Sequence, residues 1–172
     1  MHIFRDWRDL PGEARGATVA LGNFDGVHLG HAALVRAAHA ARPDAPRAVL
    51  TFEPHPREVF RPDDPPFRLT LSAERADALA ALGVELLYEL PFSPDFSLMP
   101  AEIFVSEVLH QGVGARHLVC GPDFAFGQRR GGDTRLLAQR AEALGMGLTL
   151  VPLVKDAQGP LSSTRIRRAL QD

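Results

Sequence analysis

The sequence contains a single cysteine, Cys120, and this scarcity sets the first limit on what the chain can be. One cysteine cannot form an internal disulfide, and a chain without disulfides fits a reducing compartment. No stretch is apolar for long enough to cross a bilayer, and the first residues lack the apolar core of a signal peptide. We therefore expect a cytoplasmic protein with no membrane partner.

A dominant charge of one sign is lacking as well. The chain has 19 Lys and Arg against 21 Asp and Glu, which gives a formal net charge of −2. Without an overall basic field, nucleic acid is not an expected partner. Lys155 is the only lysine, so local positive charge comes from arginine. A structural zinc site is disfavoured, because His28 and His31 lack further ligands nearby and Cys120 has no clustered partner.

Strand-like and helix-like patterns alternate along the chain. Short apolar runs predict strands at 19–21, 47–52, 84–90, 118–120 and 148–151. One-sided apolar stripes predict helices around 34–41, 76–82, 104–109 and 137–144, and a short helix follows at 162–170. Ser72 and Asp133 are suited to be N-caps, and Pro100 to a first helical position. This alternation predicts one α/β domain over residues 1–172 with a parallel sheet.

The stretch 18–31 carries the clearest chemistry. A buried strand breaks into a turn whose small residues let the backbone approach a ligand closely: Gly22, Asn23, Asp25, Gly26 and Gly30. His28 and His31 follow, three apart at a helix N-terminus, where backbone N–H groups and the helix dipole favour phosphate. The alternative for each histidine is a core or capping role. Neither a P-loop nor a GxGxxG turn is present.

Residues 23–31, NFDGVHLGH, resemble the His-x-Gly-His signature of the nucleotidylyltransferase superfamily. This extended version of the signature resembles the one found in the FMN adenylyltransferase module of prokaryotic bifunctional riboflavin kinase/FAD synthetases. Segments 51–60, 67–70, 121–127 and 162–167 are similar to further motifs of that module, in the same order. The resemblance implies a Rossmann-like three-layer sandwich with a mainly parallel sheet. It also implies transfer of AMP from ATP to FMN, giving FAD and pyrophosphate, by direct in-line attack on the α-phosphate.

The resemblance also assigns site residues. It implies catalytic roles for His28, His31 and Asn23. It implies an ATP site formed by Gly22, Phe24, Asp25, Gly30, Ser163, Thr164 and Arg167. It implies an FMN site formed by Pro54, Pro56, Arg57, Phe60 and Asp123. Taken alone, a proline-rich loop commonly just ends a strand, the 162–167 string is typical of a capped helix, and Asp25 could instead fix the turn.

The implied substrates are ATP and FMN, and the triphosphate chemistry implies Mg²⁺ without indicating its ligands. Ala125 stands where many relatives have a polar or basic residue. No riboflavin kinase domain is expected in these residues, and nothing in them indicates an oligomeric state. Two alternatives stay open: another nucleotidylyltransferase, with a pantetheine phosphate, nicotinamide mononucleotide or cytidylyl acceptor, and a flavin- or nucleotide-binding module without catalysis.

Overall fold

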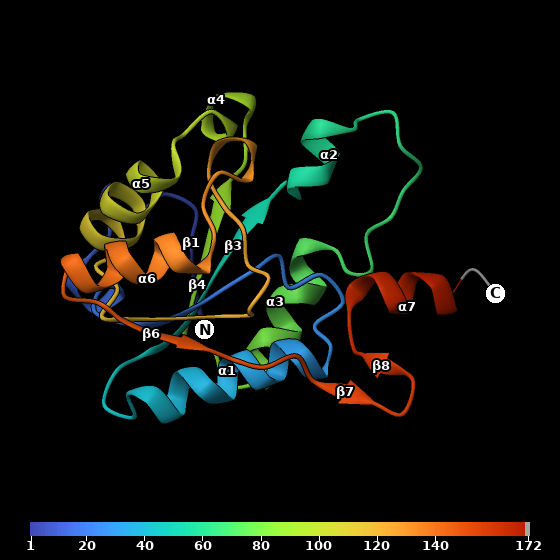
Figure 1. Ribbon diagram of the computed structural model, residues 1–172, viewed down its shortest axis with the longest axis horizontal. Helices are drawn as coiled ribbons and strands as arrows, with labels where there is room; N and C mark the ends of the chain where they lie inside the picture. The colour runs from blue at the N-terminus through green and yellow to red at the C-terminus, as the bar shows by residue number, and fades with distance from the viewer. Residues whose placement is uncertain (171–172) are drawn as a thin grey trace.

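The computed structural model describes residues 1–170 and shows a parallel β-sheet between two layers of helices (Figure 1). The strands of this sheet are, in chain order, β1 His2–Phe4, β2 Thr18–Leu21, β3 Arg47–Glu53, β4 Leu86–Pro91, β5 His117–Cys120 and β6 Gly147–Leu150. They lie in the order β1-β4-β3-β2-β5-β6, and every neighbouring pair is parallel. The predicted α/β, Rossmann-like three-layer sandwich is therefore confirmed.

The helical segments connect these strands. They are η1 Gly12–Ala14, α1 Leu29–Ala41, α2 Pro56–Phe60, α3 Ser72–Ala81, α4 Pro94–Ser97, α5 Ala101–Ile103, the π-helix η2 Phe104–Gly112, η3 Gln128–Arg130, α6 Thr134–Ala143 and α7 Ser163–Ala169. A separate antiparallel hairpin, β7 Lys155–Asp156 and β8 Gly159–Pro160, precedes α7. Among residues 1–170, no helix has the length and apolar character that a membrane span requires.

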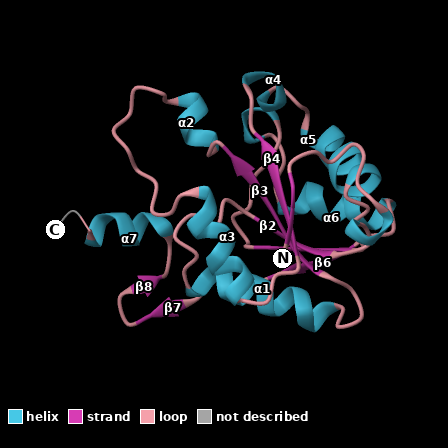
Figure 2. Ribbon diagram, turned by 180° about the vertical axis from the view of Figure 1, so that it is seen from behind, coloured by secondary structure: helices cyan, strands magenta, loops and turns pink. Residues whose placement is uncertain are grey.

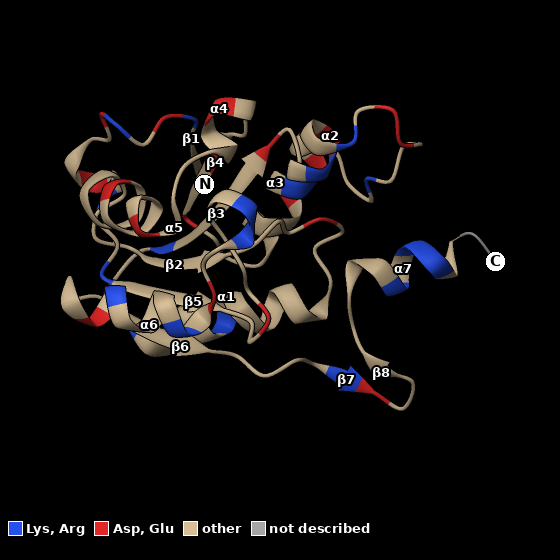
Figure 3. Cartoon of the chain, turned by 45° about the horizontal axis from the view of Figure 1, so that its top comes forward, with Lys and Arg blue, Asp and Glu red and all other residues tan. Residues whose placement is uncertain are grey.

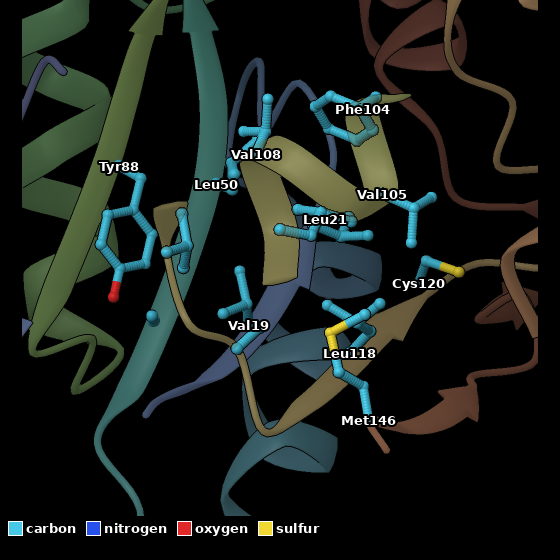
Figure 4. Close-up of a cluster of buried hydrophobic side chains, with 14 of the residues drawn as sticks. Val19, Leu21, Leu50, Tyr88, Phe104, Val105, Val108, Leu118, Cys120 and Met146 are labelled. Atoms are coloured by element: carbon cyan, nitrogen blue, oxygen red, sulfur yellow. The ribbon is translucent and has the colours of Figure 1, made fainter. Parts of the chain in front are cut away.

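The core is divided into two clusters because successive strand residues point to opposite faces of the sheet. On one face Val19, Leu21 and Leu118 pack against η2, as Figure 4 shows for Phe104 and Val108. On the other face, Ala20, Val49 and Leu87 pack against α1 and α3, which Figure 2 shows from behind. Because the inner strands are covered on both sides, they are mostly apolar and do not alternate with exposed polar residues; Thr51 and Glu89 are buried polar exceptions.

Several predicted element ends are confirmed. Asp133 caps α6, where its carboxylate accepts the N–H of Leu136 at 2.8 Å, and Gly145 follows that helix with a φ of +71°. One predicted cap is wrong: Leu71 is the N-cap of α3, and Ser72 is its first residue. The Ser72 hydroxyl instead donates to the carboxylate of Glu89 at 2.5 Å. The hydroxyl that would cap the helix is therefore used in a tertiary hydrogen bond.

The predicted apolar stripe of α3 needs a second correction. Ala80 is exposed, whereas Arg75 is fully buried on the side that faces the sheet. Several short elements were not predicted from the sequence, namely β1, η1, α2, α4, η3, β7 and β8. Each has two to five residues, too few for a periodic pattern to emerge. Pro100, expected at the first helical position, is instead the N-cap of α5, which begins one residue later at Ala101.

The strand order reverses between β2 and β5, because the chain passes from β2 to β3 and β4 on one side and then to β5 and β6 on the other. Ligands of such sheets bind outside the carboxyl ends of the strands at this reversal. The loops that follow β2, β3 and β5 all leave this edge. In both Figures 1 and 2, α7 lies beside α3.

Candidate active site at the carboxyl edge of the sheet

The turn after β2 has an unusual backbone. Phe24, Gly26 and Val27 have φ angles of +52°, +79° and +34°, a region that favours glycine. A Cβ on Gly26 would come within 2.7 Å of the Leu69 side chain, so a larger residue does not fit there. The Phe24 side chain is fully buried and packs 4.8 Å from the His31 ring. Only the backbone of Phe24, not its side chain, can therefore contact a bound nucleotide.

His28 and His31 cap the start of α1 with one nitrogen each. His28 accepts the N–H of Gly30 on Nδ1 at 3.1 Å, and His31 accepts the backbone N–H of His28 on Nδ1 at 3.3 Å. The two rings stack with centroids 3.8 Å apart. A neutral imidazole that accepts on Nδ1 carries its proton on Nε2. Both rings therefore keep an Nε2–H donor that the cap does not use.

Both imidazoles are neutral near pH 7. Burial, with a smaller contribution from the charge of His28, lowers the pKa of His31 to about 3. Burial also lowers the pKa of His28. The pair therefore offers hydrogen-bond donors rather than positive charge.

The glycines beside this pair make room for it. A Cβ on Gly30 would lie 2.9 Å from the His28 ring, and the Gly30 N–H is already used in the cap. Gly22 donates its N–H to the carbonyl of Leu50 at 3.3 Å, at the end of the sheet ladder.

Asn23 is exposed, and its carbonyl accepts the Thr51 hydroxyl at 3.0 Å. Asn23 is thus held through its backbone, with its side chain facing solvent.

Asp25 joins three segments that are distant in the sequence. Its carboxylate accepts the N–H groups of Leu69 and Thr70 at 2.9 and 3.1 Å and forms an ion pair with Arg167. Its carbonyl accepts the Ser163 hydroxyl at 2.7 Å. Burial opposes ionisation of Asp25, but the N–H groups and Arg167 outweigh it and lower its pKa. The alternative that Asp25 fixes the turn is consistent with these contacts.

The predicted triphosphate residues start α7, a helix on which basic positions gather (Figure 3). Ser163 and Arg167 face the turn after β2, and Arg167 also donates to the carbonyl of Phe67 at 2.7 Å. Thr164 is exposed. A cavity of about 420 Å³ opens between this helix and the start of α1, lined on its two sides by residues that include His28 and Ile166. The structure thus brings the two predicted ATP segments together.

The predicted FMN loop follows β3 and forms α2. Pro54 is exposed and Pro56 half-buried, and Phe60, 63% exposed, meets Phe92 edge-on at 5.6 Å. Arg57 pairs with Asp64 at 2.8 Å. Asp123 is exposed in the loop after β5.

A series of phenylalanine pairs spans the distance between α2 and the loop of Asp123. Neighbouring ring centroids in this series are 5.4–6.3 Å apart, and its members are Phe60, Phe92, Phe96, Phe104, Phe126 and Phe124. The spacing of these phenylalanines in the sequence does not indicate that their rings are connected.

His55 and Phe67 were not predicted as site residues from the sequence. His55 caps α2 through Nδ1, which accepts the Arg57 N–H at 3.1 Å, and Glu58 completes the cap. The His-x-x-Glu spacing was an available signal for it. Phe67 lies beneath both the Arg57 and Arg167 guanidiniums, 4.6 and 5.1 Å from its ring centroid. It therefore contacts one arginine of each predicted nucleotide site.

The described residues, 1–170, do not form a preformed metal site. Within residues 1–170, no group of three or more His, Cys, Asp or Glu side chains is placed to hold a metal ion. The carboxylate of Asp25, in the turn that carries the histidines, is already engaged by Leu69, Thr70 and Arg167. A metal ion that accompanies a triphosphate would have its ligands from phosphate oxygens and water.

A parallel sheet with a switch-point turn, paired histidines and a facing Ser-Ser-Thr helix defines a nucleotidylyltransferase-like α/β protein. Pantothenate synthetase from Thermus thermophilus shares this fold, with a TM-score of 0.61 at 17% identity over 96% of this chain and 67% of that one. The FAD synthetase family model matches residues 10–165, and the chain belongs to that family.

Curated relatives support membership of the FAD synthetase family. The chain is 36% identical to the bifunctional riboflavin kinase/FMN adenylyltransferase of Pseudomonas fluorescens, over 99% of this chain and 55% of that protein. It is 35% identical to the protein of the same name in Escherichia coli K12, over 91% of this chain and 51% of that one. The chain thus spans about half the length of the curated relatives it matches.

One solved structure is more similar in shape than the synthetase. A Streptococcus pneumoniae protein named macrolide-efflux protein has a TM-score of 0.85 and 34% identity, over 99% of this chain and 57% of that one.

Proposed function

We propose that this chain is an FMN adenylyltransferase that uses ATP with Mg²⁺ and FMN to make FAD and pyrophosphate. The observation that carries the proposal is the convergence on Asp25 of the histidine turn, segment 67–70 and the start of α7. Family membership and the names of the relatives support the choice of FMN as acceptor.

In the reaction we propose, a phosphate oxygen of FMN attacks the α-phosphorus of ATP, and the bond to the β-phosphate oxygen breaks as pyrophosphate leaves. No covalent enzyme intermediate is needed, so the protein must position the reactants and stabilise developing charge. His28 and His31 donate from Nε2 to the phosphate oxygens, and the backbone of 22–24 bounds the site. Ser163, Thr164 and Arg167 hold the β- and γ-phosphates.

On the acceptor side, Phe60 and the two prolines of the α2 loop wall the isoalloxazine ring, with Arg57 and Asp123 as polar contacts. An exposed aromatic ring that has its edge against a second aromatic ring is a suitable stacking surface. The cavity between α1 and α7, about 420 Å³, gives room for the nucleoside of ATP beside His28.

The direct test is incubation of the protein with ATP, Mg²⁺ and FMN, with products separated by chromatography and pyrophosphate measured. We expect equal amounts of FAD and pyrophosphate. Parallel reactions with riboflavin, nicotinamide mononucleotide or phosphopantetheine test the alternatives, and none of these is expected to react. Absence of FAD, or faster turnover of another acceptor, would contradict the proposal, and formation of FMN from riboflavin would contradict the expected lack of kinase activity.

Phe60→Ala tests the acceptor side. We expect it to weaken FMN binding roughly 2- to 12-fold, the equivalent of about 0.5–1.5 kcal/mol for an aromatic stack, with little change for ATP. Ile103→Ala, which truncates a 38% exposed apolar side chain on α5, is the matched control and should leave both affinities unchanged. Calorimetric titration measures both nucleotides, and equal losses in the Phe60 variant would show that α2 has only a structural role.

A further inference from the structure

A buried ion network lies beneath the edge of the sheet from which the site loops leave. At its centre is Arg75 of α3, whose side chain is fully buried. Its Nη2 donates to Glu53 at 2.8 Å and to Glu89 at 2.9 Å. Its Nη1 donates to the carbonyl of Asn23 at 3.5 Å. A single guanidinium therefore contacts the turn after β2, the last residue of β3 and the middle of β4.

The network continues outward with alternating charge. Arg68 forms two hydrogen bonds with Glu53, at 2.9 and 3.0 Å, and one with Glu58 of α2 at 3.1 Å. At the other end of the network, Arg5 extends inward from the surface, and its Nε donates to Glu89 at 3.0 Å. Each of the two carboxylates beside Arg75 thus has a second cation, so both are stabilised in their ionised form.

Fold stability alone does not explain a buried arginine. Removing a guanidinium from water costs several kcal/mol, and apolar residues of similar volume commonly replace buried ion networks without loss of stability. The Nε of Arg75 is buried without a hydrogen-bond partner, which adds to that cost. What arginine supplies, and an apolar residue cannot, is a rigid fork that fixes several acceptors relative to one another.

The acceptors that this fork fixes adjoin the site. Glu53 directly precedes Pro54, with which the α2 loop begins, and Asn23 opens the histidine turn. The hydrogen bond from Arg75 to Glu53, at 2.8 Å, is shorter than the one to Asn23, at 3.5 Å. Arg68 binds both Glu53 and Glu58 and so connects this contact to α2. A shift of Arg75 is therefore transmitted more strongly to the α2 loop than to the histidine turn.

We propose that Arg75 is a positioning residue for the acceptor side of the reaction, acting through Glu53 on the α2 loop; this rests on the function proposed above. Its substitution should affect the use of FMN more than the use of ATP. A purely structural role would instead lower the melting temperature and leave the KM values of the folded enzyme unchanged.

The test compares Arg75→Lys, which keeps the charge and loses the fork, with Glu53→Gln, which weakens the same contact from the loop side. Both variants should lower kcat/KM for FMN about 10- to 100-fold, the range expected when a reactant is misplaced by a fraction of an ångström to one ångström. The KM for ATP should change much less. Arg5→Gln is the matched control, because it removes a cation from Glu89 at the far end of the network, and it should leave both KM values unchanged.

The outcomes separate this proposal from the function itself. If the wild-type protein makes no FAD, the function has failed before Arg75 is considered. If the wild type makes FAD and both variants have the wild-type kcat/KM for FMN, Arg75 is structural and the positioning role is wrong. Should Arg75→Lys fail to fold, Glu53→Gln decides the question, since Glu53 is part-exposed and its replacement keeps the side-chain length.

Discussion

At the scale of single residues, His28 and His55 each start a helix in the same way, by accepting a backbone N–H on Nδ1. The sequence predicted that His28 and His31 share a helix face, but it left the capping and phosphate roles as alternatives. The structure shows that the two are compatible, because capping uses Nδ1 and leaves Nε2–H available. Spacing could not have predicted this, since it does not determine which ring nitrogen faces the helix.

This division of the ring allows a sharper test of the two histidines. Asn at the N-cap and Gln at the third helical position retain the capping interactions and remove the Nε2–H donors. We expect His28→Asn and His31→Gln each to slow the chemical step roughly 10²–10³-fold, because such donors act on charge that develops in the transition state. Their melting temperatures and ATP affinities should stay near those of the wild type. Single-turnover kinetics measure the step, and wild-type rates in both folded variants would show that the histidines only cap and pack.

The neutral histidines also predict how stability depends on pH. In the unfolded chain a histidine takes up its proton near pH 6.5, whereas burial holds the pKa of His31 at about 3 and that of His55 at about 4. The unfolded state binds more protons between these values, so stability present above pH 6.5 is lost as the pH falls towards 4. The slope is at most about 1.4 kcal/mol per pH unit for each histidine.

Urea unfolding measured from about pH 7.5 down to about pH 5 covers the window in which histidines titrate and most carboxylates do not. We expect the free energy of unfolding to fall over this window in the wild type and to fall less steeply in His31→Gln. Parallel curves for the two proteins would show that His31 takes up its proton at the same pH in the folded and the unfolded state.

At the scale of elements, the long helices and inner strands could be predicted because their apolar patterns extend over enough residues and their caps are local. Asp133 and Gly145 mark the ends of α6 in the sequence, and both have those roles in the structure. Tertiary contacts decided the exceptions. Ser72 bonds to Glu89 rather than capping α3, and a buried arginine on α3 has no signature in a pattern of apolar residues.

The loop after β5 depends on one glycine in a way that a matched pair of variants can measure. Gly127 and Gly145 have φ angles of +73° and +71°, so alanine is strained at both, and the ψ of 178° at Gly127 lies in a region that is essentially restricted to glycine. A Cβ on Gly127 would lie 2.5 Å from the Cα of Ala101, whereas nothing lies within 4 Å of one on Gly145. Gly127→Ala should therefore destabilise the protein clearly more than Gly145→Ala in thermal unfolding. Equal losses would mean that the loop moves away from α5 without cost.

At the scale of the whole molecule, the site is made by contacts between residues far apart in the sequence. The Ser163 hydroxyl meets the carbonyl of Asp25 across 138 positions. Local patterns placed each motif on a loop or helix start, and the α/β alternation placed three of the loops at one sheet edge. That α7 turns back onto the histidine turn could be expected only from the family resemblance, because no pattern of its own residues specifies the partner.

Arg167 tests this long-range assembly. In the structure it is paired with Asp25 and the carbonyl of Phe67, at the place where the triphosphate is proposed to bind. We expect Arg167→Ala to raise the KM for ATP about 10- to 100-fold, as for loss of a hydrogen bond to a charged group, and to lower kcat no more than that. Arg168→Ala, which removes an exposed arginine of the same helix that does not line the cavity, is the control and should leave the KM for ATP unchanged. A larger effect on kcat than on KM would place Arg167 at the reacting phosphate.

The position of α7 has a consequence for how the protein matures on the ribosome. Within residues 1–170, no fully buried residue follows Met146, and α7 itself buries none. Domains begin to fold while synthesis continues, so the hydrophobic core can be complete before α7 has left the exit tunnel. A nascent chain would then hold a finished sheet with only half of its nucleotide site. The proposed activity would be acquired in a separate, later step, when α7 docks on Asp25.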